Sequence, residues 1–231
     1  MEEGSIFSII GPNGAGKTTI FNCITGIYRP TTGSIKFKGT EIVGRKPHYT
    51  ARLGIARTFQ NIELFSHLTT MDNLLLGRHI HMKTGVFSGA LFFGKRFPAA
   101  REECAHRERV EKIIEFLELE AVRDVPVAAL PYGTRKLVEL GRALAMEPSL
   151  LLLDEPTAGM NQEEKQDTMF WIQDIRDDFQ VTILMVEHDM SLVMDLSDEV
   201  MALNFGVKLT QGSPQEVQNH PDVLEAYLGT D

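Results

Sequence analysis

A glycine-rich segment near the N-terminus constrains the fold more than any other feature of this chain. Residues 11–18 read Gly-Pro-Asn-Gly-Ala-Gly-Lys-Thr and match the pattern G-x-x-x-x-G-K-[ST]. An apolar, β-branched run at residues 5–10 precedes the segment, and apolar residues at helical spacing follow it to Ile27. A simple glycine turn beside an exposed lysine would not explain both flanking elements. The pattern therefore predicts a buried strand, a loop and a helix.

Such a loop is suited to binding phosphate groups. Its glycines allow successive backbone N–H groups to turn toward phosphate oxygens, and the helix N-terminus adds the positive end of its dipole. Lys17 supplies a positive charge for the β- and γ-phosphates, and the Thr18 hydroxyl is a predicted Mg²⁺ ligand. The residues expected to bind the nucleotide here are Gly11, Pro12, Asn13, Gly14, Ala15, Gly16, Lys17, Thr18 and Thr19.

A second motif is an apolar strand that ends in two acids. The run Leu150–Leu153 is followed by Asp154 and Glu155. Asp154 falls at the carboxyl end of the strand, where open α/β sheets bind ligands, and it can hold Mg²⁺ through water. Glu155 can polarise a water molecule that attacks the γ-phosphorus. Alone, the motif could be a solvated strand end, but beside the phosphate loop it predicts nucleotide hydrolysis.

Strand and helix patterns alternate at both ends of the chain, and a mostly helical block separates them. Continuous apolar runs at 150–153 and 181–186 are typical of a parallel sheet covered on both faces. Further strands are predicted over 34–38, 55–59 and 199–203, and an amphipathic helix over 107–119. We therefore predict an α/β core formed by residues 1–61 and 147–231, with a helical subdomain at 62–146.

Charge and composition narrow the function classes. The net charge of −9 argues against a general nucleic-acid binder, which needs a basic face. No stretch reaches the roughly 20 apolar residues of a membrane helix, and the acidic N-terminus does not read as a secretion signal. The two cysteines cannot form a disulfide framework, which favours a cytosolic protein. The histidines outside the motifs lack partners at ligand spacing, so none is assigned to a metal.

The order and spacing of these motifs resemble the ATP-binding-cassette (ABC) transporter ATPases over essentially the whole chain. Gln60 resembles the family's lid glutamine, and His188 resembles its switch histidine. Leu130–Thr134 stands where the family signature is expected, and Ala158–Asn161 resembles the loop after the strand acids. The resemblance implies a phosphate-loop NTPase fold with a RecA-like three-layer core and an inserted helical subdomain.

The resemblance also implies the site and its partners. Glu155, His188 and Gln60 are the expected catalytic residues, and Mg²⁺ would be held by Thr18, Gln60 and Asp154. Two ATPase subunits, identical or different, would close head to tail around two MgATP, each receiving Gly133 of the other chain as a phosphate donor. The pair would drive transmembrane permease subunits from the inner face of the cell membrane.

A narrower resemblance is to the branch that serves branched-chain amino-acid importers. It rests on Thr58–Asn61, Leu68–Asn73, Val186–Met190 and the tail Pro221–Gly229. It implies uptake of branched-chain or other apolar amino acids, delivered by an extracytoplasmic binding protein. Alternatives are an ATPase of a lipid or polysaccharide export system and a soluble ABC ATPase without a transport role.

The sequence departs from the family pattern both at the signature segment and at the N-terminal end. Pro131 replaces the signature serine and lacks both a hydroxyl and an N–H donor, while Asn161 stands where aspartate is frequent. Two N-terminal strands that family members usually carry, with an aromatic residue that stacks on adenine, are missing before Ser5. An aromatic cluster in the helical block is expected either to pack that block or to dock a membrane subunit; it comprises Phe87, Phe92, Phe93 and Phe97.

Overall fold

A computed structural model describes residues 1–82 and 98–228. The chain divides into two compact units, Met1–Gln60 with Ser149–Asp231, and Asn61–Pro148. These boundaries differ by one and two residues from the expected ones. The aromatic cluster from Phe87 to Phe97 lies outside the described residues.

The first unit is built on a six-stranded sheet with the order β4-β5-β6-β1-β7-β8. All neighbouring strands are parallel except β7 and β8, which are antiparallel. The strand bounds are β1 Ile6–Ile10, β4 Ile55–Arg57, β5 Leu150–Asp154, β6 Thr182–Val186, β7 Glu199–Asn204 and β8 Val207–Gly212. Strands β1, β5 and β6 are buried at every position, which accounts for their continuous apolar sequence.

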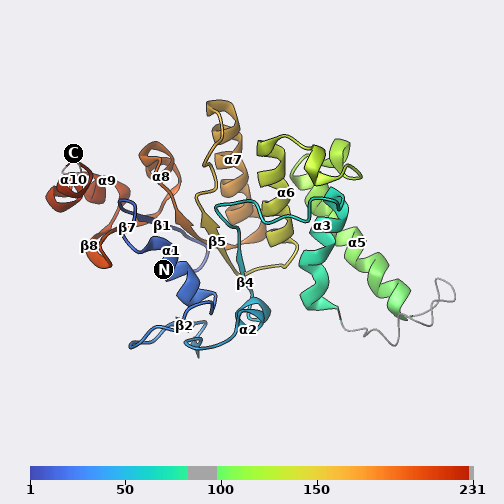
Figure 1. The fold of residues 1–231 in the computed structure, drawn as a ribbon, viewed down its shortest axis with the longest axis horizontal. Coiled ribbons are helices and arrows are strands. Elements are labelled where there is room, and N and C mark those ends of the chain that lie inside the picture. The colour runs from blue at the N-terminus through green and yellow to red at the C-terminus, as the bar shows by residue number, and fades with distance from the viewer. Residues whose placement is uncertain (83–97, 229–231) are drawn as a thin grey trace. The chain divides into compact units, whose positions relative to one another are not determined.

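Helices cover both faces of this sheet, and the alternation of side chains along β1 separates the two cores. Phe7 and Ile9 pack in one cluster with Phe21 of α1, whereas Ile10 packs in another with Val193 of α8. Figure 1 shows α1 and α8 on opposite sides of the sheet. The helix bounds are α1 Lys17–Ile24, α2 Pro47–Arg52, α7 Gln162–Phe179, α8 Met190–Leu196, α9 Pro214–Gln218 and α10 Pro221–Leu228.

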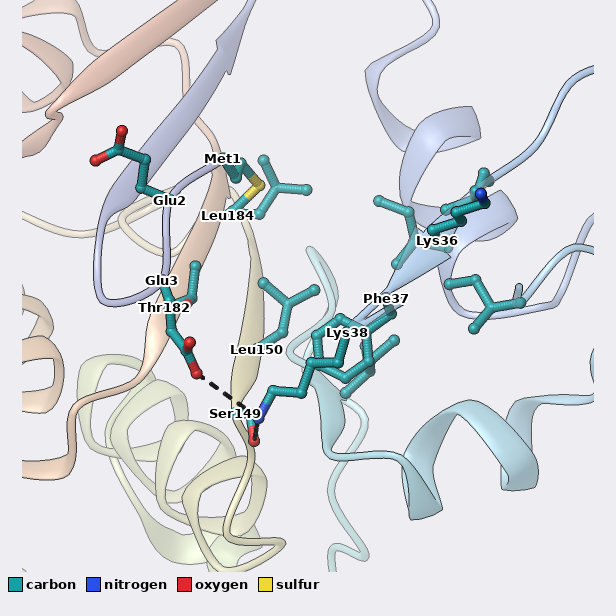
Figure 2. Close-up of a pocket in the computed structure, with 14 residues that line it drawn as sticks. Met1, Glu2, Glu3, Lys36, Phe37, Lys38, Ser149, Leu150, Thr182 and Leu184 are labelled. Atoms are coloured by element: carbon teal, nitrogen blue, oxygen red, sulfur yellow. Dashed lines mark hydrogen bonds and ion pairs between the residues drawn. The ribbon is translucent and has the colours of Figure 1, made fainter. Parts of the chain in front are cut away.

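A short hairpin beside the sheet replaces the strand expected over Ser34–Lys38. Only Lys36–Phe37 is extended, as β2, and it pairs antiparallel with β3, Thr40–Glu41. The hairpin borders a largely apolar cavity of about 440 Å³ (Figure 2). Lys38 is one of the lining residues; it donates to Ser149 Oγ at 2.9 Å and lies 3.8 Å from a Glu3 carboxylate oxygen. The first residues of β5 and β6 line this cavity, so it lies at the end of the sheet opposite the phosphate loop.

The second unit is helical. Its elements are α3 Thr70–Gly77, η1 Arg78–His81, α5 Pro98–Phe116, η2 Glu120–Val122, η3 Val127–Ala129 and α6 Tyr132–Leu144. Glycines let α3 and α6 approach closely, because a Cβ on Gly77 would lie 2.3 Å from the Arg142 carbonyl oxygen. Leu74 and Leu117 fill the space beside Gly141. The amphipathic helix predicted over 107–119 corresponds to α5, which begins earlier, at Pro98. It also ends earlier, at Phe116, because Glu118 adopts a left-handed φ of 54°.

None of the helices within residues 1–82 and 98–228 is both long and apolar enough to cross a lipid bilayer.

Candidate active site

The glycine-rich segment forms a loop between β1 and α1 that only glycine permits at its first position. Gly11 has φ +152°, and a Cβ there would lie 2.1 Å from the Leu203 carbonyl oxygen of β7. The turn between β7 and β8 is hydrogen-bonded to the loop, because the Gly206 N–H donates to the Ala15 carbonyl oxygen at 2.9 Å. Contacts with β7 and the β7–β8 turn therefore fix the backbone of residues 11–16, the loop that we predict to bind phosphate.

Lys17 begins α1 and its side chain turns back along the loop. Its ammonium group donates to the carbonyl oxygens of Gly11 at 2.7 Å and Pro12 at 3.0 Å. Burial lowers the pKa of Lys17, and the carboxylates of Glu155 and Asp154 oppose that shift. The lysine charge therefore lies close to both acids, while Thr18 and Thr19 are exposed on the first turn of α1.

Glu155 follows the end of β5 and collects donors from the two neighbouring strand ends. Gln60 Nε2 donates to its Oε2 at 2.8 Å, and His188 Nε2 lies 3.0 Å from its Oε1. The residue adopts a left-handed φ of +50°, uncommon for a non-glycine residue and often found where a site orients a side chain. The structure thus brings together the three residues that the sequence singled out as catalytic.

Asp154 is buried at the last position of β5. Its Oδ2 accepts a hydrogen bond from Arg57 Nη2 at 2.7 Å, whereas Oδ1 accepts none from the residues that the structure describes. With the Thr18 hydroxyl and the Gln60 amide, this carboxylate makes up an all-oxygen donor set of the kind that Mg²⁺ prefers. The residues present therefore fit a magnesium ion.

Sequence reasoning missed Glu187, which links the segment after β5 to the segment after β6. Its side chain is buried, and Oε1 accepts from the Thr157 backbone N–H at 3.1 Å and hydroxyl at 2.6 Å. Its Oε2 accepts from the His188 backbone N–H at 2.8 Å. The available signal was an acid directly before His188 in the sequence.

Arg57 was also missed, together with its partner Asn22. Arg57 bridges Asp154 and Asn22, because its Nη2 donates to Asp154 Oδ2 and its Nη1 donates to Asn22 Oδ1 at 2.6 Å. The signal was a single arginine within the apolar run at residues 55–59.

Two further predicted segments have clear local roles. Pro131 occupies the N-cap position of α6 without a side-chain hydrogen bond. Gly133 therefore lies in the first turn of that helix, in the second unit.

Asn161 is the N-cap of α7. Its side chain accepts a hydrogen bond from the Glu164 N–H at 3.0 Å, and the Glu164 carboxylate accepts one from the Asn161 N–H.

The sequence and the fold of this chain are similar to those of known proteins. The sequence model of the family described as ABC transporter matches residues 1–158, and one described as branched-chain amino acid ATP-binding cassette transporter matches residues 207–231. The high-affinity branched-chain amino acid transport ATP-binding protein BraF of Pseudomonas aeruginosa is 43% identical over 232 residues, covering 99% of this chain and 89% of BraF. LivG of Escherichia coli, described in the same words, is 41% identical over 227 residues, covering 97% of this chain and 87% of LivG.

Solved structures show the same similarity. A nucleotide-free ATP-binding cassette from an ABC transporter superposes with a TM-score of 0.82 at 31% identity, over 98% of this chain and 88% of that one. The ADP conformation of an ATP-binding cassette of an ABC transporter gives a TM-score of 0.83 at 32% identity, over 98% and 89%.

Proposed function

This chain belongs to the ABC transporter ATP-binding family, and from that premise we propose that it hydrolyses MgATP to power the uptake of branched-chain amino acids. The observation that carries the catalytic part is the Glu155 carboxylate, which is hydrogen-bonded to Gln60 and His188 and lies near Lys17. ATP binding follows from the family, whereas the magnesium ion and the residue roles are part of the proposal.

We assign the hydrolytic step to Glu155. It takes a proton from water as the water oxygen bonds to the γ-phosphorus and the bond between that phosphorus and the β–γ bridging oxygen breaks, so that ADP is the leaving group. Lys17 and the loop N–H groups stabilise the charge on the phosphate oxygens, and His188 and Gln60 hold the Glu155 carboxylate in place. Bound magnesium, held by Thr18, Asp154 and Gln60, would neutralise charge on the β- and γ-phosphates.

We further propose that two ATPase subunits pair around the nucleotides. Gly133 supports this role because it lies in the first turn of α6, where backbone N–H groups lack helical partners. Pro131 offers no such donor, so the contribution of this segment rests on the helix N-terminus.

The cargo and the membrane partner are inferred from the relatives. BraF and LivG are named for high-affinity branched-chain amino acid transport, which supports the same cargo here. A permease in the membrane, supplied by an extracytoplasmic binding protein, would take up the amino acid. The segment after Gln60 is the proposed docking surface, because Phe65 is 59% exposed there and Glu63 and Ser66 are exposed beside it.

The variant Glu155→Gln tests the catalytic proposal. Losing the proton acceptor is expected to slow phosphate release by about 10²–10⁴-fold, while binding of a fluorescent ATP analogue stays at the wild-type level. Glu163→Gln, at an exposed position in the first turn of α7, is the matched control and should hydrolyse ATP normally. Wild-type turnover in Glu155→Gln would remove Glu155 from this role.

The cargo is tested separately in cells. Uptake of labelled leucine should fall when the wild-type gene is replaced by the Glu155→Gln version and remain normal with Glu163→Gln. Unchanged leucine uptake together with lost ATPase activity would leave the ATPase assignment intact and overturn the amino-acid cargo.

A further inference from the structure

Arg57 is a charged residue in a buried strand. Both of its Nη atoms are hydrogen-bonded, whereas its buried Nε has no hydrogen-bond partner among the described residues. Its side chain is 7% exposed, and that of its partner Asp154 is 3% exposed. The guanidinium carbon lies 5.4 Å from the ring centre of Phe21 and 5.0 Å from that of Phe59. Such cation–π contacts and the fixed shape of the guanidinium leave it little freedom to reorient.

The two ends of this guanidinium bind two different elements. Nη2 donates to Asp154 Oδ2 at the end of β5, and Nη1 donates to Asn22 Oδ1 on α1. Asn22 lies four residues after Thr18, so the two residues are neighbours on the surface of the same helix. Arg57 therefore connects the two elements that carry the proposed magnesium ligands Thr18 and Asp154.

We propose that Arg57 is a positioning residue for the metal, an inference that rests on the magnesium site of the proposed function. By binding Oδ2 of Asp154, it turns the other oxygen, Oδ1, toward the metal and its water shell. By binding Asn22 at the same time, it fixes the separation between Asp154 and the helix that carries Thr18. Hydrogen-bond partners of this kind set the orientation of metal-binding groups in many proteins.

A purely structural role predicts something different. A buried ion pair that loses one partner leaves an uncompensated charge, which destabilises the protein as a whole. If Arg57 only stabilised the sheet, its replacement would weaken nucleotide binding equally with and without a divalent ion. If Arg57 positions Asp154, the loss should appear in metal binding alone.

The test measures Mn²⁺ binding to the ATP-bound protein by electron paramagnetic resonance and ATP binding in excess chelator by fluorescence. Arg57→Lys keeps the charge but cannot bind Asp154 and Asn22 at once, and Asn22→Ala removes only the contact with α1. We expect both variants to bind Mn²⁺ about 10–100-fold more weakly and to bind metal-free ATP as the wild type does. Arg52→Lys, an exposed arginine on α2, is the control and should leave both affinities unchanged.

Equal losses in the two measurements, or unchanged Mn²⁺ affinity in both variants, would overturn the inference. If Arg57→Lys fails to fold, Asn22→Ala decides, since it retains the buried ion pair. A wild-type protein whose ATP binding does not respond to Mn²⁺ at all would instead contradict the magnesium site of the proposed function, so the two failures are distinguishable.

Discussion

Gly11 shows how much one residue can determine at a phosphate-binding loop. Its φ of +152° and the Leu203 carbonyl 2.1 Å from a hypothetical Cβ leave no room for a side chain. We predict that Gly11→Ala displaces the loop from β7 and abolishes ATP binding. The strain of a side chain at positive φ costs about 1–2 kcal/mol, and we expect the free energy of unfolding to fall by more than this amount.

Gly33→Ala is the comparison for this prediction, because Gly33 also has a positive φ, +93°, but no atom within 4 Å of a Cβ. Gly33→Ala should lower the free energy of unfolding only by the cost of the backbone strain, and it should leave ATP binding intact. Denaturant unfolding and nucleotide titration measure both variants, and equal stability losses would show that the Leu203 contact does not matter.

His106 supplies a pH-dependent contribution to stability. Burial lowers its pKa below the ordinary 6.5, and the Arg78 charge lowers it further, because Arg78 Nε donates to the neutral Nδ1 at 3.2 Å. Since the folded pKa lies below the unfolded one, the unfolded chain takes up the proton first as the pH falls. We predict that stability is retained above about pH 6.5 and declines below it.

His106→Gln removes this titration. The difference in melting temperature between wild type and variant should therefore shrink between about pH 7 and pH 5, as the wild type loses its advantage. A constant difference across this range would mean that His106 does not change its proton affinity on folding.

At the scale of elements, the carboxyl ends of adjacent parallel strands assemble the site. The chain continues from β4 to Gln60, from β5 to Glu155 and from β6 to His188, and these three side chains meet in one hydrogen-bonded group. The loop after β1 adds Lys17 beside them. Sheet order thus brings together residues that are far apart along the sequence.

Helix α7 depends on its N-terminal cap. Asn161→Ala removes the side-chain acceptor for Glu164 N–H, and we predict a loss of about 1 kcal/mol in the free energy of unfolding. Asn161→Asp should keep the stability, because aspartate caps equally well and its charge is favourable at a helix N-terminus. Urea denaturation measures both, and an equal loss in the two variants would contradict the capping role.

The sequence predicted the fold where burial makes a strand uniformly apolar. The predicted fold class is confirmed by the solved cassettes, and strands β1, β5 and β6 carry the clearest signal. Strand β8 was missed because residues 207–212 are exposed or only half-buried and mix polar with apolar side chains. Strand β2 is only two residues long because only β3 pairs with it. Tertiary pairing decides such edge elements, and local sequence does not record it.

The site was readable from sequence only as far as its motifs. Lys17, Asp154 and Glu155 belong to local patterns, so spacing identified them. The supporting residues Arg57 and Glu187 act through partners distant in sequence, 97 positions away in the case of Arg57 and Asp154. A single charge in a buried strand indicates that a partner exists but does not say which one.

At the scale of the molecule, the proposed docking surface can be mapped by crosslinking. In a variant in which both native cysteines are replaced, a single cysteine at Glu63 or Ser66 is expected to crosslink to a permease subunit in membranes. Both positions are exposed in the second unit. A cysteine at the exposed Glu216 of α9 is the control, and crosslinks from that position alone would place the membrane partner elsewhere.

The path of the chain between β4 and β5 has a consequence for the evolution of the protein. These strands are parallel neighbours, and the chain leaves after Gln60 and returns at Ser149, so the whole helical unit is the crossover that joins them. Closing a longer loop costs only about 0.6 kcal/mol for each doubling of its length. Insertions and deletions can therefore accumulate within this crossover while the strand register, and with it the grouping of Gln60, Glu155 and His188, is inherited unchanged.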